Sequence, residues 1–428
     1  MGPEPRASAN PTIAAERALL TSNHLNEIEF LNTTWKYLAN VHTICYVHDI
    51  VNMIYSMNID PISPKELERD LAKVLRELLS SIAWLHGWTV EPAKGIDRGW
   101  DLQASIPLPT GGKAVLCIEC KLHFQPSQFS SLIDRPCHAR QSKNISRVLA
   151  MPFVSPRMAG LCQEHEWSWF DLAGNCRLNI PGVLVIERAG NQPVRIQRRA
   201  GANLSTPESG RIVRALLAPE NVGQRWTQRD MVTHFAKLAP PVTAPSLALV
   251  NKIVQHLRDQ AFVEQLPNRG FRVRDYEGLL QAWSGAYRLD RHARRQYFTL
   301  LQGRSLQEKL KTLDPEGRGR LAYAAFSAAD FQAAHVRQPK TWLYVERHFE
   351  DEFRSALETK AVDSGENLIV LIPEDAGVFY RLEPAPNRLA CTNLVQTYVD
   401  LAHAGGRGNE AAEALLQQRL KPAWAAAA

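Results

Sequence analysis

Residues 99–122 read GWDLQASIPLPTGGKAVLCIECKL, and this stretch decides the fold of the first half of the chain. Two runs with alternating apolar residues flank a turn-forming segment that contains proline and glycine, and this pattern predicts a β-hairpin. If the turn is centred near Thr110, residues whose numbers sum to about 220 lie opposite each other, so Asp101 faces Glu119. Because residues two apart on a strand share a face, Lys121 points in the same direction as Glu119. The sequence therefore predicts two carboxylates and one ammonium group at one place on a sheet.

Two carboxylates that meet across adjacent strands can hold a hard divalent cation, and we expect magnesium (Mg2+) with Asp101 and Glu119 as its ligands. Lys121 is then left to position a water molecule or to stabilise developing charge. The arrangement resembles the PD-(D/E)xK nuclease superfamily, in which an Asp on one strand is followed by E-x-K on the next. The resemblance implies a restriction-endonuclease-like α/β sandwich. It also implies a catalytic set of Asp101, Glu119, Lys121 and a helix glutamine near the metal, Gln141.

Several alternatives stay open at this stage. The E-x-K pattern is common, so a strand can end in this way with Lys121 as a surface residue. Domains of this superfamily can also bind DNA without cutting it, and magnesium is expected only if the nuclease site is active. The segment 171–175, DLAGN, could belong to an active site, but Gly174 favours a turn because glycine readily adopts positive φ.

Further helices and strands are expected around the hairpin. A long helical segment over 63–85 precedes it, and a second helix is expected around 138–150. The elements that complete the sandwich are a strand, a helix and two more strands, over 152–154, 157–165, 167–171 and 182–186.

The composition is that of a soluble globular protein, with 45% hydrophobic and 22% charged residues. A length of 428 residues is enough for about three domains, and a net charge of +6 permits nucleic-acid binding without requiring it. No apolar run is long enough for a membrane span and the N-terminus lacks the layout of a signal peptide, so we expect a cytoplasmic protein without a membrane partner.

Seven cysteines, an odd number, favour reduced thiols. Cys117 and Cys120 form a C-x-x-C, but residues three apart on a strand point to opposite faces, so we expect no shared metal.

The expected fold class is a multidomain α/β protein. A disordered leader over 1–15 precedes a helical cap and the nuclease-like domain over 16–187. A basic linker over 188–208 could track phosphates, although an exposed arginine run is usually a solvated face. A central winged helix-turn-helix follows over 209–287, and a C-terminal α+β partner domain covers 288–428.

The pattern over 209–287 predicts three helices and a hairpin. The first helix is RIVRALLAPE. The second, TQRDMVTHFAKLA, opens with Thr227 as its N-cap and Asp230 three residues later, close to a capping box. The third, TAPSLALVNKIVQHLRDQ, is expected to start at a Thr243 cap. Its buried stripe consists of Val250, Ile253, Val254 and Leu257.

The polar face of the third helix is free to enter a major groove of double-stranded DNA. We expect its DNA contacts to come from Ser246, Asn251, Lys252 and Gln255. The hairpin over 261–275 is the expected wing, with Arg269 at its tip and Arg272 as a further DNA contact. Winged helices sometimes only pair proteins, but the polar, basic outer face favours DNA.

From residue 288 onward, helices and strands alternate. The segment 405–408, GGRG, lacks the context of a phosphate-binding loop. Asp400 and Arg407 could be functional, but capping and turn roles are the preferred interpretation. The expected helices are 327–334, 391–405 and 409–420, and the expected strands are 341–347, 367–373 and 377–383.

The order of segments from Asp171 onward resembles AbiEi-type antitoxin regulators of bacterial type IV toxin–antitoxin systems. The segments that carry the resemblance are DLAGNCRL, WTQRDMV, LLQAWSGAY, FSAAD, SGENLIVLIPEDAGVFY and VQTYVDLAHAGGRGNEAAEALL. The resemblance implies a winged helix that binds operator DNA and a C-terminal domain that contacts a protein partner, such as a nucleotidyltransferase-like toxin. In this chain the winged helix lies centrally, behind the nuclease-like domain, and not at the N-terminus.

Three functions compete on these grounds. The first is a sequence-specific DNA-binding regulator or AbiEi-like antitoxin that carries a nuclease-like domain, with a homodimer as an open alternative. The second is a magnesium-dependent endonuclease that its winged helix directs to DNA. The third is a scaffold or antitoxin that acts mainly through its C-terminal domain. The regulator ranks first because recognisable motifs cover more of its domains.

Overall fold

The computed structural model describes residues 62–93, 100–109, 111–133, 144–180, 183–193, 202–238, 242–314, 319–385 and 389–426. The chain divides into two compact units, Met1–Ser63 and Pro64–Ala428, and every helix and strand described below belongs to the second. The expected leader and almost all of the helical cap, as well as Gln141, lie outside the described residues. None of the helices in the described ranges combines the length and the apolar character that a bilayer crossing requires.

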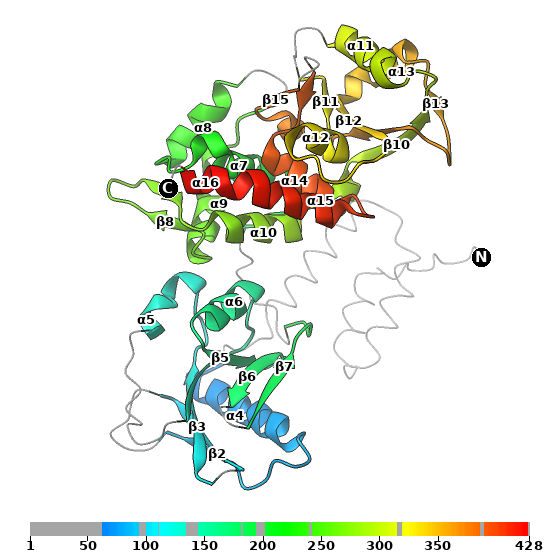
Figure 1. Ribbon diagram of the computed structural model, residues 1–428. Helices are drawn as coiled ribbons and strands as arrows, with labels where there is room; N and C mark the ends of the chain where they lie inside the picture. Colours follow the sequence, from blue (N-terminus) through cyan, green and yellow to red (C-terminus); the bar gives the residue numbers. More distant parts are fainter. Residues whose placement is uncertain are drawn as a thin grey trace, which may run out of the picture. The chain divides into compact units, whose positions relative to one another are not determined.

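Seven strands form the first sheet, and they lie in the sheet in the order of the chain (Figure 1). The pairs β3–β4 and β4–β5 are parallel, and all other neighbours are antiparallel. The strands are β1 (Thr89–Pro92), β2 (Leu102–Pro107), β3 (Lys113–Cys120), β4 (Ile145–Met151), β5 (Ser168–Asp171), β6 (Cys176–Ile180) and β7 (Leu184–Arg188).

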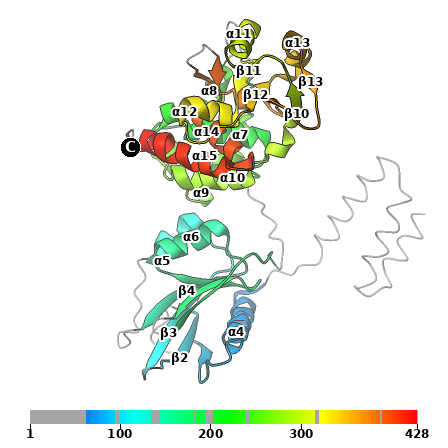
Figure 2. The same cartoon turned by 45° about the vertical axis from the view of Figure 1, so that its right-hand side comes forward.

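Strand β3 is buried on both of its faces. Its side chains alternate, so Leu116 and Ile118 share one face and Cys117 points to the other. Cys117 packs in a hydrophobic cluster with residues of helix α6 (Pro156–Glu164), while Leu116 and Ile118 are fully buried on the opposite face. Helix α4 (Pro64–Ser80) contacts β1, β3 and β5 and buries a leucine-rich stripe (Figure 2). The sheet is therefore covered, as expected of an α/β fold with a parallel centre.

The helix expected around 138–150 is wrong in the part of this range that the structure describes. Residues 138–143 lie outside the described residues, and Ile145–Met151 is the central strand β4. Val148 and Leu149 point to opposite faces and both are fully buried. A strand buried on both faces is a continuous apolar run, and periodicity alone does not distinguish such a run from a buried helix.

The expected hairpin is confirmed, and so is its register. Leu102 pairs with Ile118, and Pro107 pairs with Lys113. The expected elements over 63–85, 157–165 and 167–171 correspond to α4, α6 and β5. The strand expected over 152–154 is wrong, because this segment follows β4 and leads to the α6 cap at Ser155. β7 lies two residues later than expected, and β6 was not predicted.

Three helices, a hairpin and a fourth helix follow. They are α7 (Pro207–Leu217), α8 (Gln228–Ala236), α9 (Leu247–Asp259), β8 (Val263–Gln265), β9 (Phe271–Val273) and α10 (Tyr276–Ala286). The capping box that opens α8 is confirmed, because Asp230 N–H donates to the Thr227 side chain and the Asp230 carboxylate accepts from Thr227 N–H. The expected Thr243 cap is wrong: α9 begins after Ser246, whose hydroxyl oxygen accepts from Leu249 N–H at 3.3 Å.

The second sheet has seven strands in the order β13-β10-β14-β12-β11-β16-β15. Helices α12, α14 and α15 pack together beside it, and α14 and α15 lie below the strands in the view of Figure 1. The strands are β10 (Ala293–Phe298), β11 (Leu321–Tyr323), β12 (Thr341–Val345), β13 (Lys360–Ala361), β14 (Leu368–Ile372), β15 (Glu383–Pro384) and β16 (Ala390–Cys391). The helices are α11 (Gly303–Leu313), α12 (Ala325–Gln332), α13 (Glu350–Ala356), α14 (Leu394–His403), α15 (Gly408–Leu415) and α16 (Lys421–Ala426).

Most elements expected after residue 288 are found within a few positions, with one exception. The strand expected over 377–383 is a 3-10 helix over Ala376–Phe379, followed by the short strand β15. Asp375 caps this turn, because its side chain accepts from Gly377 N–H at 2.8 Å. A capped turn satisfies the backbone groups that a strand would otherwise have to pair.

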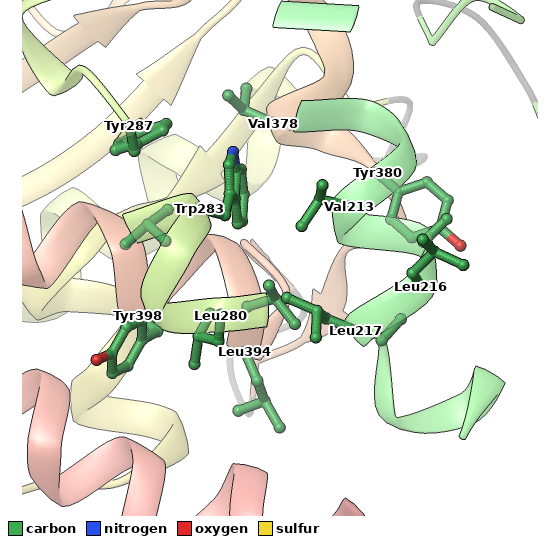
Figure 3. Packing of buried hydrophobic residues seen from close by; sticks show 14 of the residues in the cluster. Val213, Leu216, Leu217, Leu280, Trp283, Tyr287, Val378, Tyr380, Leu394 and Tyr398 are labelled. Atoms are coloured by element: carbon green, nitrogen blue, oxygen red, sulfur yellow. The ribbon is translucent and has the colours of Figure 1, made fainter. Parts of the chain in front are cut away.

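One hydrophobic core joins α7 and α10 to the second sheet and its helices. Figure 3 shows Leu216 and Leu217 of α7 together with Trp283 of α10 and with Leu394 and Tyr398 of α14. All five side chains are buried. Residues on both sides of position 287 therefore stabilise the same core.

Candidate functional site

The hairpin β2–β3 positions the residues of the first candidate site. Asp101 directly precedes β2, and its N–H donates to the carbonyl of Ile118 at 3.0 Å. Because Leu102 pairs with Ile118, the next position along the hairpin brings Asp101 level with Glu119. Glu119 is the second-last residue of β3, and Lys121 directly follows the strand. Both carboxylates therefore come from the same end of one hairpin.

The side chains of this site already have protein partners. Lys121 Nζ lies 2.5 Å from Glu119 Oε1, and the Glu119 side chain is only 2% exposed. A buried carboxylate is costly unless it is paired, so the ammonium group compensates its charge. Asp101 Oδ2 accepts a hydrogen bond from Cys120 N–H at 2.7 Å. These contacts hold Asp101 and Glu119 at adjacent strand ends.

Helix α4 adds an acidic residue that the sequence analysis missed. Partial burial raises the pKa of Glu68, and the negative charge of Asp101 raises it further. The pKa of the Cys120 thiol is also raised, first by burial and then by Asp101, Glu68 and Glu119. Glu68 follows the buried Leu67 on α4, and this helical spacing gave no hint that it approaches the hairpin.

The donor set is small for a metal site. In the part of the chain that the structure describes, no three His, Cys, Asp or Glu side chains are grouped in a way that could hold a metal ion. Two carboxylates at the same end of the hairpin fit a hard cation such as magnesium, which takes one or two carboxylates and keeps several water molecules. Cys117 and Cys120 lie three residues apart on β3 and point to opposite faces of the sheet, so they do not add ligands to one ion.

The segment 171–175 forms a turn, as preferred from the sequence. Asp171 is fully buried, and its carboxylate accepts from Asn175 N–H at 3.0 Å, from Asn175 Nδ2 at 3.0 Å and from Val154 N–H at 3.2 Å. Gly174 has a φ of 82°, in the left-handed region. The Asp171 carboxylate thus stabilises the local backbone.

Helix α9 is the centre of the second candidate site. Its stripe of Val250, Ile253, Val254 and Leu257 is buried, as predicted. Asn251, Lys252 and Gln255 are exposed. Asn251 Oδ1 accepts from Gln228 Nε2 at 2.9 Å, and Gln255 bonds to Asp259 and Arg258 on its own helix. Ser246 is exposed at the N-terminus of α9, where its hydroxyl caps the helix.

The hairpin β8–β9 follows α9 directly. Arg269 is exposed in its turn, with a φ of 60°, beside Asn268 with a φ of 61°. Arg272 lies opposite Glu264 in the register, and the two side chains form an ion pair. The guanidinium of Arg269 therefore projects at the tip, while that of Arg272 is neutralised across the strands.

A buried polar cluster lies in the shared core, and the sequence analysis missed it. Asp400 on α14 is fully buried, and its Oδ1 accepts from Tyr287 OH at 2.8 Å, Tyr344 OH at 2.9 Å and Gln396 Nε2 at 2.7 Å. The preferred capping or turn role of Asp400 is therefore wrong. Gln396 Oε1 in turn accepts from Nε of the buried Arg214 at 2.5 Å. The cluster joins α7, α10, β12 and α14.

The titration of this cluster reflects its burial. Burial raises the pKa of Asp400 to about 7, although its hydrogen bonds and the charge of Arg214 act in the opposite direction. Burial, followed by the positive charge of Arg214, lowers the pKa of His292 to about 4. Arg407, by contrast, has the expected local role, because it precedes α15 and pairs with Glu410 at 2.7 Å.

Comparison with known proteins bears on the C-terminal part of the chain. No curated protein and no solved structure matches the chain. A family model does match, from Arg272 in β9 to Lys421 at the start of α16. Residues 272–421 are similar to the family described as transcriptional regulator, AbiEi antitoxin, type IV toxin–antitoxin system, in agreement with the resemblance found in the sequence.

Proposed function

We propose that this protein is a sequence-specific DNA-binding regulator of the AbiEi antitoxin type. The observation that carries the proposal is the family match over residues 272–421, whose description names both a transcriptional regulator and an antitoxin. The matched segment shares its hydrophobic core with α7, α8 and α9, so the helices before the match belong to the same folded body.

The order of α7, α8, α9 and the hairpin β8–β9 supports DNA as the ligand. In a winged helix of this order, the third helix enters the major groove and the hairpin contacts the backbone or minor groove. Asn251, Lys252 and Gln255 are the exposed polar residues of α9, and Arg269 is the exposed cation of the turn. Arginine, asparagine and glutamine are the side chains that read base edges and phosphates.

The test of DNA binding uses the full-length protein and a randomised double-stranded library from which bound duplexes are selected. If the protein is a sequence-specific regulator, the selected duplexes share a defined consensus. In gel-shift titrations at fixed salt, the protein then binds this consensus far more tightly than scrambled duplex. Equal affinity for consensus and scrambled DNA contradicts sequence-specific regulation.

The antitoxin part of the proposal needs a separate test. The family description implies a toxin counterpart, so co-expression with the product of a neighbouring nucleotidyltransferase-like gene should restore growth that this product alone inhibits. A chain with residues 293–426 deleted is not a useful control, because the core is shared. Loss-of-binding variants on α9 separate DNA binding from toxin neutralisation without disturbing that core.

A magnesium-dependent endonuclease is the second candidate, and the hairpin β2–β3 favours it. Asp101 and Glu119 would hold the cation, and Lys121, beside Glu119, would stabilise negative charge on the scissile phosphate or the attacking water. Magnesium, when bound, supplies Lewis-acid activation of the phosphate. We rank this function second because the metal would have to compete with Lys121 for Glu119 Oε1.

Incubation of plasmid and linear DNA with the protein in magnesium or manganese tests the second candidate. Cleavage by the wild type that disappears in both Glu119→Gln and Lys121→Met would place the endonuclease first. The matched control is Lys113→Met, at the other end of β3, which leaves cleavage unchanged if the strand end is the site. DNA binding through α9 should survive all three substitutions.

A further inference from the structure

Arg225, Trp226 and Thr227 directly precede α8, and Gln228 is its first residue; these four residues contact both parts of the second candidate site. We refer to them as the bracing segment. Its backbone is fixed to β9, because Trp226 N–H donates to the Phe271 carbonyl at 2.8 Å and Phe271 N–H donates to the Trp226 carbonyl at 2.7 Å. The Trp226 side chain is 1% exposed, so this connection is anchored in the core.

Arg225 connects the bracing segment to the turn of the hairpin. Its guanidinium donates a hydrogen bond from Nη2 to the carbonyl of Pro267, two residues before Arg269. It also passes directly over Gly270, where a Cβ atom would lie 2.5 Å from Arg225 Nε. The absence of a side chain at Gly270 therefore makes room for Arg225.

The turn that Arg225 holds has an unusual backbone. Asn268 and Arg269 adopt φ values of 61° and 60°, a left-handed conformation that is uncommon for residues other than glycine. Such a conformation persists where surrounding contacts determine it. Those contacts include the hydrogen bond from Arg225 and two to the Gly270 carbonyl, from Leu266 N–H at 2.7 Å and from Gln265 Nε2 at 2.8 Å. Together they fix the direction in which Arg269 leaves the turn.

Gln228 connects the other end of the bracing segment to α9. Its Nε2 donates to Asn251 Oδ1 at 2.9 Å. With its oxygen engaged in this way, the Asn251 side chain directs its NH2 group away from Gln228. An amide NH2 donor recognises the acceptors on the major-groove edge of a purine, N7 and, in guanine, O6.

We propose that Arg225 and Gln228 are positioning residues for nucleic-acid recognition, Arg225 through Arg269 and Gln228 through Asn251. The bracing segment thereby sets the spacing between the hairpin tip and the polar face of α9. The inference rests on the proposed DNA binding and adds to it which residues decide affinity and base preference. Neither Arg225 nor Gln228 needs to contact DNA for this role.

The experiment uses the full-length protein and the consensus duplex selected from a randomised library. Arg225→Ala and Arg269→Ala each weaken binding about tenfold, the effect of one lost charged contact. Because Arg225 acts through Arg269, the double variant binds no more than about twofold more weakly than Arg269→Ala alone. Arg225→Lys, which can still donate to the Pro267 carbonyl, recovers part of the affinity. Arg304→Ala, on the exposed face of α11, is the matched control and binds as the wild type does.

Gln228→Ala is tested by repeating the selection. Its consensus loses the purine preference at one position, as does that of Asn251→Ala, while the other positions keep theirs. Thermal unfolding of each variant within a few degrees of the wild type separates positioning from general loss of fold. The inference would be overturned if the affinity losses of Arg225→Ala and Arg269→Ala multiplied in the double variant. An unchanged consensus for Gln228→Ala would also overturn it. A wild type that selects no consensus would overturn the proposed function as well, so the two failures are distinguishable.

Discussion

Tyr287 donates its hydroxyl proton to Oδ1 of Asp400 at 2.8 Å, although 113 positions separate the two residues. Tyr287 directly follows α10, and Asp400 lies within α14. His292 extends the chain of hydrogen bonds, because its Nδ1 accepts from Glu374 N–H at 3.1 Å and its Nε2 lies 2.9 Å from the Tyr287 hydroxyl. The bond to Glu374 requires an unprotonated Nδ1, so the neutral imidazole fits this position.

The first prediction concerns the pH dependence of folding stability. The folded pKa of Asp400, about 7, lies above its ordinary value of 3.8, so this residue stabilises the fold at low pH and loses that contribution as pH rises towards 7. His292 acts in the opposite sense, because its folded pKa of about 4 lies below 6.5 and protonation destabilises the fold as pH falls. Asp400→Asn removes the first effect and keeps the second.

Urea unfolding of the wild type and Asp400→Asn at pH 4.5, 6.0 and 7.5 measures this difference. Relative to the wild type, the variant should gain stability as pH rises, by about 1.4 kcal/mol for each pKa unit of the Asp400 shift. A difference that is constant with pH, or that changes in the opposite direction, would show that Asp400 does not titrate as its burial implies.

The second prediction concerns the charges on the proposed DNA-binding face. Lys252→Ala and Arg269→Ala should each reduce the dependence of log Kd on log salt by about one unit, because each removes one phosphate contact. Gel-shift titrations at several salt concentrations measure the slope. Lys309→Ala, exposed on α11, serves as the control and should keep the wild-type slope. Unchanged slopes in both test variants would move the DNA contacts away from α9 and its hairpin.

The third prediction concerns the pair Glu119–Lys121. Lys121→Met leaves the Glu119 carboxylate buried without its ammonium partner and should destabilise the fold by about 1–3 kcal/mol. The double variant Glu119→Gln/Lys121→Met removes the buried charge as well and should recover most of this loss. Chemical denaturation of the wild type, the two single variants and the double variant gives the coupling energy. A coupling energy near zero would mean that solvent compensates Glu119 and that the ion pair contributes nothing.

The fourth prediction concerns the C-terminal helix α16. Trp424 is 6% exposed, donates from Nε1 to the Leu217 carbonyl at 3.0 Å and stacks on Tyr276 at 5.6 Å. Trp424→Ala should cost about 3–5 kcal/mol through the cavity that it creates. Lys421→Ala on the same helix breaks only a surface ion pair with Glu277 and should cost less than about 1 kcal/mol. Equal effects of the two substitutions in thermal unfolding would contradict a structural role for α16 against α7.

The sequence by itself determined the features that depend on neighbouring residues. The β2–β3 register followed from alternation and a proline- and glycine-containing turn, and it brought Asp101 level with Glu119. The Thr227–Asp230 capping box and the buried stripe of α9 followed in the same way. These signals are local, because a cap or a strand face is defined within a few residues.

Only the tertiary structure decided the features that depend on burial. Residues 145–151 form a strand because β3 and β5 pair with it on either side, and its apolar run alone is compatible with a helix. Asp400 became part of a buried cluster because α7, α10 and β12 bring Arg214, Tyr287 and Tyr344 to it. Such contacts join residues that are far apart in the chain, so no local pattern contains them. The sequence could therefore place the candidate residues on their elements, but burial and long-range packing decided which of them meet.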